Sequence, residues 1–244
     1  MKALRAMTLV EIKLFLRDPY TALTSILLPT VLLIAFGLIP GTSKADDQYG
    51  GLRFIDYWAP SMIVITVSVL ALQALPTYVA TYREKGVLRR MSTTPVHPTR
   101  LLAAQLITQF AAAVVALALM LVVGSVGFDV KMPQHPAEFA LAYLLGIVAL
   151  LTLGLLVSSI APSGRAAYGI GLLLFFPTMF FGGVYVPRSI LPSGIADIGN
   201  YFPPSVQALQ DSWTGSGVQP LHLAVMAVFI VAIGALAGKV FRWS

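Results

Sequence analysis

The densest group of charged residues in the sequence lies at positions 82–100, between two long apolar runs. One acid in this segment, Glu84, stands among five bases: Arg83, Lys85, Arg89, Arg90 and Arg100. A loop so rich in cations between apolar segments is typical of the cytoplasmic side of a membrane protein. Its charges could dock a partner protein, or they could do no more than set the topology of the chain. The residue types alone leave both interpretations open.

Residues 83–91 are predicted to form a short amphipathic helix. At 100° per residue, one arc of this helix is apolar, and it comprises Val87, Leu88 and Met91. Glu84 falls within that arc, where a carboxylate would need a partner cation or backbone N–H groups. The run at 92–95 ends with Pro95 and stops the helix, and its hydroxyls can cap the next one. We therefore interpret this segment as a docking element.

Few residues suit other kinds of chemistry. The absence of cysteine excludes disulfides, iron–sulfur clusters, Cys-ligated zinc and thiol nucleophiles. His97, His135 and His222 lie in predicted loops or at span ends, and no H-E-x-x-H motif occurs, so neither a metal site nor a hydrolytic site is expected. The run at 234–240 is one residue too short for a P-loop and has Val240 where the magnesium-binding hydroxyl belongs. We predict no catalytic residue, no metal and no cofactor in this chain.

The composition is that of an integral membrane protein. Of the 244 residues, 57% are hydrophobic and 11% are charged, whereas soluble domains contain about 25% charged residues. The net charge of +6 in such a chain reports inward-facing loops and contact with anionic lipid more often than nucleic acid. No segment resembles a module that reads a nucleic-acid groove, and we expect no nucleic-acid partner.

Six apolar segments are long enough to cross the hydrocarbon core as helices. Their predicted bounds are 20–39, 58–80, 101–123, 139–160, 168–186 and 220–240. Residues 1–18 combine four bases with an apolar arc, which predicts a helix lying on the inner membrane surface up to Pro19. The expected fold is therefore an all-α membrane protein with a single transmembrane domain over residues 1–244.

The basic residues predict the orientation of these spans. With both termini inside, the segments 1–18 and 82–100 and the last residues of the chain hold most of the 16 basic residues on the inner side. Positive charge collects on the cytoplasmic side of membrane proteins. We therefore place both termini in the cytoplasm of a multi-pass protein of the cell membrane, and the segment 187–219 outside.

The outer segment 187–219 is too apolar for a solvated loop. Glycines and prolines shape this segment and the end of the fifth span: Gly182, Gly183, Pro187, Pro192, Pro203 and Pro204. We expect short helices that re-enter the outer half of the bilayer, with their irregular backbone covered by protein. An ordinary external loop lying on the surface is the alternative.

The interior of the predicted spans contains amides and no central ionisable group. The polar and aromatic candidates for a transport pathway are Gln73, Gln105, Gln109, Phe180 and Tyr185. Aromatic residues in a span are, however, more often in contact with lipid or in packing. Ion-driven carriers generally need an intramembrane ionisable group to couple the ion to the substrate. The energy for any transport is therefore expected to arrive through a loop, and 82–100 has the required size and charge.

The order of these parts resembles the membrane subunit of type-2 ABC exporters, the class that includes daunorubicin-type drug-efflux permeases and polysaccharide-export permeases. The resemblance covers nearly the whole chain. It rests on the interfacial helix that ends in Phe15-Leu16-Arg17-Asp18-Pro19, the coupling loop from Arg83 to Pro95, and the outer region from Gly182 to Pro204. Of these three features, the loop is the most specific.

This resemblance implies a set of partners and roles. The loop between spans two and three would contact an ATPase subunit through Arg83, Glu84, Lys85, Gly86, Leu88, Arg89, Arg90 and Pro95. The resemblance also implies two permease chains, as a homodimer or a heterodimer, two ATPase chains that bind Mg-ATP, and outer helices that form a gate. An amphipathic substrate, such as a drug, a lipid-like molecule or a peptide, would enter laterally from the inner leaflet.

On this interpretation, closure of the ATPase pair moves the helix 83–91 as a lever, and a rigid connection through Pro95 transmits the movement to the third span. Glu84 anchors the lever by pairing with a cation on the ATPase or on the N-terminal helix. The alternatives are a non-transporting membrane scaffold that docks a partner through the same loop, and an ion-coupled carrier. Substrate-dependent ATP hydrolysis identifies an exporter, and sensitivity to an ion gradient identifies a carrier.

Overall fold

The computed structural model describes residues 2–42, 44–46, 49, 51–91, 93, 97–181, 184–185, 194, 199, 202, 206–215 and 217–241. Within these ranges the chain is almost entirely helical, with one short antiparallel hairpin as its sheet. Helices suit a chain in a bilayer because their backbone N–H and C=O groups are satisfied internally. The predicted all-α fold is confirmed.

Six helices of the described chain are long and apolar enough to cross a membrane. They are α2 (Pro19–Gly37), the continuous helix α3–η2–α4 (Phe54–Glu84), α6 (Thr99–Phe128), α7 (Pro136–Ile160), α8 (Gly164–Phe181) and α11 (Pro220–Val240). A multi-pass membrane protein with six spanning helices is therefore confirmed. The second and third helices extend beyond 58–80 and 101–123, because their polar ends find hydrogen-bond partners within the protein.

The second of these helices is the centre of the bundle, and we call it the central helix. It consists of α3 (Phe54–Ser68), the π-helical segment η2 (Val69–Ala74) and α4 (Leu75–Glu84). It is the most buried of the six spanning helices and packs against α2, α7, α8 and α10 (Val206–Thr214). Movement at either end of this helix therefore reaches most of the bundle.

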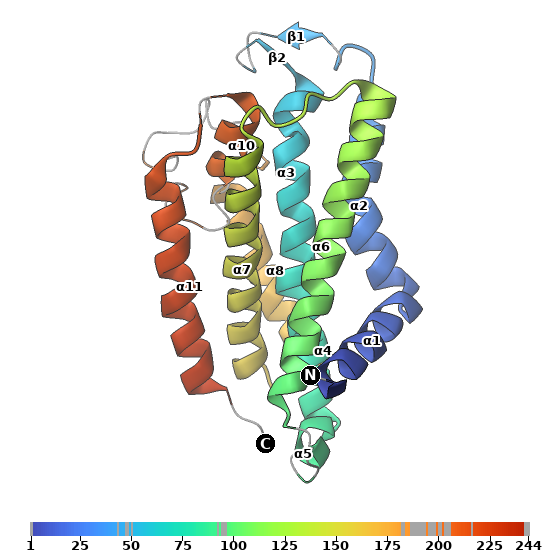
Figure 1. The fold of residues 1–244 in the computed structure, drawn as a ribbon, viewed down its shortest axis with the longest axis vertical. Coiled ribbons are helices and arrows are strands. Elements are labelled where there is room, and N and C mark those ends of the chain that lie inside the picture. Colours follow the sequence, from blue (N-terminus) through green and yellow to red (C-terminus); the bar gives the residue numbers. More distant parts are fainter. Residues whose placement is uncertain are drawn as a thin grey trace.

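The remaining elements lie at the two ends of the bundle. Helix α1 (Lys2–Arg17) runs obliquely to the spanning helices and packs against α6 (Figure 1). Helix α5 (Val87–Met91) follows the central helix. Strands β1 (Ala45–Asp46) and β2 (Leu52–Arg53) pair antiparallel, with Ala45 opposite Arg53. The hairpin therefore lies between the predicted spans 20–39 and 58–80, in a segment for which the sequence predicts no span.

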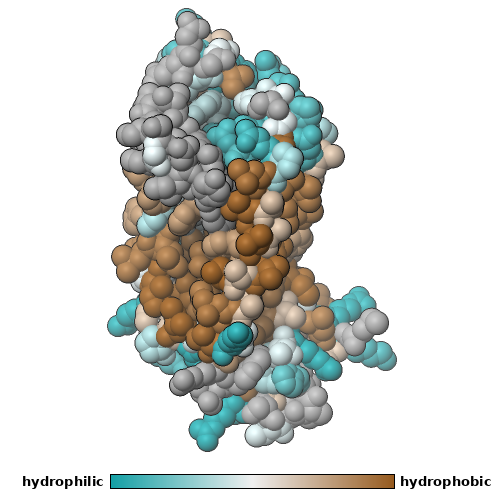
Figure 2. Space-filling view, turned by 90° about the vertical axis from the view of Figure 1, so that its left-hand side faces the viewer, coloured by the Kyte–Doolittle hydropathy of each residue, from teal (hydrophilic) through white to brown (hydrophobic). Residues whose placement is uncertain are grey.

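Figure 1 shows how these elements define the two ends. The start of α1, helix α5 and the last turn of α11 lie at one end, which we call the α5 end. The β-hairpin and α10 lie at the other, which we call the hairpin end. Figure 2 shows a broad apolar belt between hydrophilic surfaces at the two ends. A belt of this kind is the surface that a bilayer covers.

Close helix packing surrounds the π-helical segment. Pro76 lacks the N–H that a regular α-helix would donate to Leu72 O, so the backbone is irregular at this point. A Cβ added to Gly171 of α8 would overlap Leu72 O, and a Cβ added to Gly154 of α7 would overlap Ala71 O. The two glycines therefore let α7 and α8 approach the backbone of the central helix directly.

Candidate functional site

The segment predicted as one docking helix over 83–91 is two helices. Helix α4 ends at Glu84, a turn follows at Lys85 and Gly86, and α5 begins at Val87. The break occurs because Gly86 has a φ of +67°, a left-handed conformation that glycine adopts readily and that often terminates helices. Arg83 and Glu84 consequently belong to the end of the central helix, and the lever of the sequence prediction is shorter than expected.

Arg83 and Glu84 tie the central helix to the neighbouring helix pair. Arg83 donates hydrogen bonds to Ser159 O, at 3.2 Å, and to Ala161 O, both at the end of α7. Glu84 Oε2 accepts from the backbone N–H of Gly164, the first residue of α8, at 3.1 Å. Free N–H groups and the dipole of a helix start favour such a carboxylate. Of the two kinds of partner that the sequence suggests for Glu84, a cation or backbone N–H groups, the structure shows a backbone N–H, at a helix N-terminus.

Helix α5 turns its apolar side toward the chain and its basic side outward. Leu88 is only 1% exposed, whereas Lys85, Arg89 and Arg90 are exposed. Leu88 was assigned to the ATPase contact, but α5 packs back against α4 and so buries it. The guanidinium of Arg90 donates to Lys85 O at 3.2 Å, which closes the turn. The surface available to a partner at this turn is therefore basic. Pro95, which was also predicted to contact the partner, lies outside the described residues.

On its other side, the end of the central helix is bonded to α1. Glu11 is 4% exposed, and its Oε2 accepts from Tyr82 Oη at 2.8 Å and from Gln105 Nε2 of α6. Burial raises the pKa of Glu11, although the hydrogen bonds from Tyr82 and Gln105 oppose that shift. One carboxylate thus connects three helices at the α5 end.

A second carboxylate, one helical turn away along the central helix, makes a similar connection. Asp18 is the N-cap of α2 and accepts from Thr21 N at 3.2 Å and from Thr21 Oγ1 at 2.7 Å. Tyr78 Oη donates to Asp18 Oδ2 at 2.9 Å. Burial would raise the pKa of Asp18, but these hydrogen bonds together hold it below its ordinary value. Asp18 therefore remains ionised at neutral pH.

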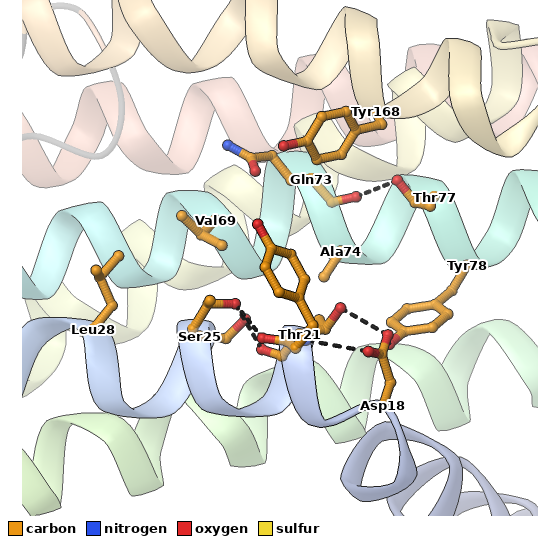
Figure 3. A pocket seen from close by; sticks show the side chains of 12 residues that line it. Asp18, Thr21, Ser25, Leu28, Val69, Gln73, Ala74, Thr77, Tyr78 and Tyr168 are labelled. Carbon is orange, nitrogen blue, oxygen red and sulfur yellow. Dashed lines mark hydrogen bonds between the residues drawn. The ribbon is translucent and has the colours of Figure 1, made fainter.

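Asp18 also borders a cavity of about 250 Å³ between α2, the central helix and α8 (Figure 3). Its lining residues are Asp18, Tyr20, Thr21, Thr24, Ser25, Leu28, Val69, Gln73, Ala74, Thr77, Tyr78 and Tyr168. Hydroxyls, one amide and one carboxylate stand among apolar side chains, and none of the lining residues is basic. Such a mixture suits an amphipathic molecule, because it offers both hydrogen bonds and apolar contact.

The predicted pathway residues do not lie together. Gln73 lines the cavity, but Gln105 is bonded to Glu11 and Gln109 is only 1% exposed within the bundle. Both amides belong to α6 and are buried against protein, where a polar group costs less than it would against lipid. Phe180 and Tyr185 are partly exposed and do not line the cavity. Asp18 and Tyr78 are not among the residues predicted for the pathway. The available signal for Asp18 is its position directly before Pro19, which is typical of a helix start.

A second cavity is purely hydrocarbon in character apart from one hydroxyl. It has a volume of about 310 Å³ and is lined by Leu106, Ile107, Phe110, Val148, Leu151, Thr152 and Leu155 of α6 and α7. The Thr152 hydroxyl donates to Val148 O within its own helix, at 2.7 Å. This cavity offers nothing to orient a polar group, so the cavity at Asp18 is the better candidate site for a substrate.

The hairpin end is held by an ion pair whose carboxylate is buried and whose guanidinium is partly exposed. Arg53 Nε lies 2.6 Å from Asp56 Oδ2, and Arg53 also donates to Phe128 O at 3.3 Å and to Asp129 O. Asp56 Oδ1 accepts from Lys131 N at 3.0 Å. Both ends of the central helix are thus fixed to neighbouring helices.

Six residues are predicted to shape an outer gate at the end of the fifth span and in the outer segment. Gly182, Gly183, Pro187, Pro192, Pro203 and Pro204 lie outside the described residues. Within 187–219, the structure describes the helix α10, whose Trp213 packs edge-on against Phe139 of α7 at a centroid distance of 5.4 Å. The re-entrant outer gate therefore stays a prediction.

Comparison with known proteins places the chain among transporters. Its sequence matches the family model described as ABC-2 type transporter over residues 2–210. It is also 24% identical over 206 residues to a Bacillus subtilis (strain 168) protein named "Putative transport permease YvfS". That similarity covers 83% of this chain and 81% of the relative. The matched residues 2–210 include α1, the central helix, α5 and the whole lining of the cavity at Asp18.

Proposed function

Since the chain belongs to the ABC-2 type transporter family, we propose that it is the membrane permease subunit of an ATP-driven exporter. The family is a membrane component of transporters that is not itself catalytic, and its members generally work with an ABC ATPase partner. In our proposal Mg-ATP is bound and hydrolysed on that separate subunit. Similarity to a protein named as a transport permease supports the same function.

The observation that carries this proposal is the basic turn between the central helix and α5. Lys85, Arg89 and Arg90 are exposed there, at the end of the most buried helix of the bundle. A cationic patch attracts an acidic surface and orients its approach. We assign the ATPase contact to these three residues and to Gly86, whose left-handed conformation presents them.

The assembly that we propose contains two ATPase chains and two permease chains, the latter as a homodimer or a heterodimer in the cell membrane. The α5 end faces the cytoplasm in this assembly. Helix α1 begins and α11 ends at the α5 end, so both termini are assigned to the cytoplasmic side (Figure 1). The accumulation of basic residues at that end supports the assignment.

The cavity at Asp18 indicates the kind of substrate. Tyr20 and Tyr168 offer aromatic faces beside an ionised carboxylate, and both features attract a cation. Leu28 of α2 and Val69 of the central helix offer apolar contact in the same cavity. We therefore propose an amphipathic substrate, such as a drug, a lipid-like molecule or a peptide, with a cationic or hydrogen-bond-donating head. It enters from the cytoplasm or the inner leaflet.

Co-purification tests the ATPase contact. The tagged chain is isolated from its native membranes, and the co-purifying proteins and their ATP hydrolysis are measured. The triple variant Lys85→Glu/Arg89→Glu/Arg90→Glu is expected to lower the amount of associated ATPase by about tenfold, since opposing charges become like charges. The matched control is Lys44→Glu, an exposed base at the hairpin end, which is expected to leave association unchanged.

The outcomes of this experiment separate the candidate functions. An ATPase that is lost with the triple variant and is stimulated by an amphipathic amine supports the exporter. An associated protein without ATP hydrolysis would favour a membrane scaffold. Uptake that responds to an imposed ion gradient, with no associated ATPase, would favour a carrier.

A further inference from the structure

We propose that two tyrosine–carboxylate hydrogen bonds make α4, α1 and the start of α2 a single moving unit, which carries movement of α5 to the wall of the cavity. We call the four residues the tyrosine joint: Glu11, Asp18, Tyr78 and Tyr82. This inference rests on the proposed function, because it requires a nucleotide-driven partner that moves α5. Movement of α5 can pass along the chain into α6, and the joint gives it a second route, through α1 and α2.

The spacing of the four residues allows both bonds to form at once. Tyr78 and Tyr82 are four residues apart in α4, so their side chains lie one turn apart on the same face. Glu11 and Asp18 are separated by about two helical turns and therefore also share a side of the chain. Tyr78 donates to Asp18 at 2.9 Å and Tyr82 donates to Glu11 at 2.8 Å.

Burial makes the bond at Glu11 difficult to exchange for water. The Glu11 side chain is 4% exposed, and Gln105, which donates to the same oxygen, is 3% exposed. A hydrogen bond inside a protein is stronger than one in water, and an unpaired buried carboxylate is costly. The contact between α1 and the central helix is therefore expected to survive a displacement of α5.

Asp18 extends the joint into α2. It caps that helix by accepting two hydrogen bonds from Thr21, at 3.2 Å and 2.7 Å. Thr21 and Ser25, from the first two turns of α2, line the cavity beside Asp18 (Figure 3). A displacement of Tyr78 therefore moves Asp18, the start of α2 and one wall of the cavity together.

The opposite wall of the cavity is attached to the central helix by close packing. Tyr168 belongs to α8, whose Gly164 and Gly171 lie directly against residues of the central helix, and whose first N–H donates to Glu84. This wall therefore needs no tyrosine–carboxylate bond to follow α4. The wall formed by α2 packs less closely against α4, so we infer that it follows α4 through the tyrosine joint, which couples the partner to the substrate site.

Spin-label distances test the joint directly. The chain has no cysteine, so Leu9→Cys on α1, Thr93→Cys after α5 and Val231→Cys on α11 give unique label sites, and all three residues are exposed. Distances from α11 to α1 and to α5 are measured in nanodiscs with the co-purified ATPase, before and after trapping with Mg-ATP and vanadate. The parent chain is compared with Tyr78→Phe/Tyr82→Phe, which removes two hydroxyls and keeps both rings.

The matched control is Tyr143→Phe. Tyr143 is buried in α7, and its hydroxyl donates to Ala113 O at 2.8 Å, so this variant also loses one buried tyrosine hydrogen bond. We expect α1 and α5 to shift together in the parent chain and in the control. In the double variant, the α5 shift is expected to persist and the α1 shift to fall by more than half.

Two results would overturn the joint while leaving the exporter intact. One is a double variant that keeps the full α1 shift, and the other is a parent chain in which α5 moves and α1 does not. If no partner moves α5 in the parent chain, the proposed function fails instead. The isolated chain then decides the joint, because the distance distribution between labels at positions 9 and 93 must broaden in the double variant and stay narrow in Tyr143→Phe.

A conservative pair of variants distinguishes the hydrogen bond from simple packing. Glu11→Gln keeps an oxygen that can accept from Tyr82, so it is expected to keep the coupled shift of α1 and α5. Glu11→Leu fills the same space without an acceptor and is expected to lose at least half of the α1 shift. Equal shifts in the two variants would contradict the proposal.

Discussion

Glu84 at the end of the central helix accepts a hydrogen bond from the backbone N–H of Gly164, the residue that begins α8, at 3.1 Å. The two residues are 80 positions apart in the sequence. Together with Arg83, this bond fixes the end of the central helix to the short turn between α7 and α8. The turn carrying the basic residues of α5 is consequently attached to helices on both sides, because Tyr82 bonds to α1 on the other side.

Removal of the Glu84 carboxylate is expected to loosen the first turn of α8. A carboxylate at a helix start contributes about 0.3 to 1 kcal/mol when it is exposed to solvent. Glu84→Ala should therefore raise amide hydrogen exchange in residues 164–168 by about twofold to fivefold. Glu84→Gln, which keeps an acceptor oxygen, should give a smaller increase. Lys85→Ala is the control, and equal exchange in the parent chain and Glu84→Ala would contradict the anchoring role.

Gly154 and Gly171 are expected to be intolerant of alanine. The added Cβ would overlap Ala71 O and Leu72 O, which belong to the backbone of the central helix and cannot turn away. Overpacking of this kind costs about 1 to 3 kcal/mol, so each variant should unfold several degrees below the parent chain in detergent. The three tryptophans of the chain, Trp58, Trp213 and Trp243, provide the fluorescence signal.

The control for these variants is Gly169→Ala in the same helix as Gly171. A Cβ at Gly169 meets no atom within 4 Å, and alanine has a higher helix propensity than glycine. Gly169→Ala should therefore unfold at the same temperature as the parent chain or slightly above it. A similar loss of stability in Gly169→Ala and Gly171→Ala would rule out the proposed close packing.

The buried carboxyl of Glu11 predicts a pH dependence of stability. Its pKa is raised in the folded chain because burial disfavours the charged form. The folded chain thus binds this proton more tightly than the unfolded chain does. The resulting stability is fully present below the unfolded pKa, about 4.3, and is lost as pH rises through the folded pKa.

Glu11→Gln is the variant that tests this dependence. Because glutamine does not titrate, the variant should lose the part of the pH dependence that lies above about pH 4.3. It should also unfold at a higher temperature than the parent chain at neutral pH. The measurement is the midpoint temperature of unfolding, taken at about ten pH values between pH 4 and pH 8. Parallel curves for the two chains would exclude Glu11 as the titrating group.

The spanning helices could be predicted from the sequence because hydropathy over about 20 residues reports the bilayer directly. The predicted spans 139–160 and 220–240 lie within or coincide with α7 and α11. The ends of the second helix were less predictable. Asp56 and Arg83 are polar, yet they remain helical because partners elsewhere in the chain accept or donate their hydrogen bonds.

The partners of the carboxylates could not be predicted from the sequence. Residues 83–91 show an apolar arc and suggest that Glu84 needs a cation or N–H groups, but no pattern within this segment points to Gly164. Glu11 and Tyr82 are likewise 71 positions apart. Helical periodicity indicates which side of a helix is polar and leaves open which other helix meets it. Gly86 is the one visible signal of the break within the predicted docking helix, because glycine readily adopts the left-handed conformation that ends a helix.

Removal of Asp56 from the ion pair at the hairpin end should lower the stability of the chain more than removal of a half-exposed carboxylate at the same end. The Asp56 side chain is 3% exposed and accepts bonds from Arg53 and Lys131 N, so Asp56→Ala removes the charged partner of the guanidinium and the acceptor of a backbone N–H. Breaking a fully buried pair costs about 3 to 5 kcal/mol, and the cost here should be lower, because the Arg53 side chain is 19% exposed and keeps two backbone acceptors. The comparison is Glu138→Ala, in which a half-exposed carboxylate loses its bond to Val218 N.

Both variants remove a carboxylate that accepts a backbone N–H. They differ in burial and in the contact with a charge partner, which is 2.6 Å from Arg53 for Asp56 and 3.9 Å from the partly exposed His135 for Glu138. Unfolding in detergent should therefore begin at a clearly lower temperature in Asp56→Ala than in Glu138→Ala. Hydrogen exchange should rise in the first turn of α3 for the former and around Val218 for the latter. Equal melting temperatures would mean that Arg53 finds sufficient partners in Phe128 O and Asp129 O, and that the ion pair does not hold this end of the central helix.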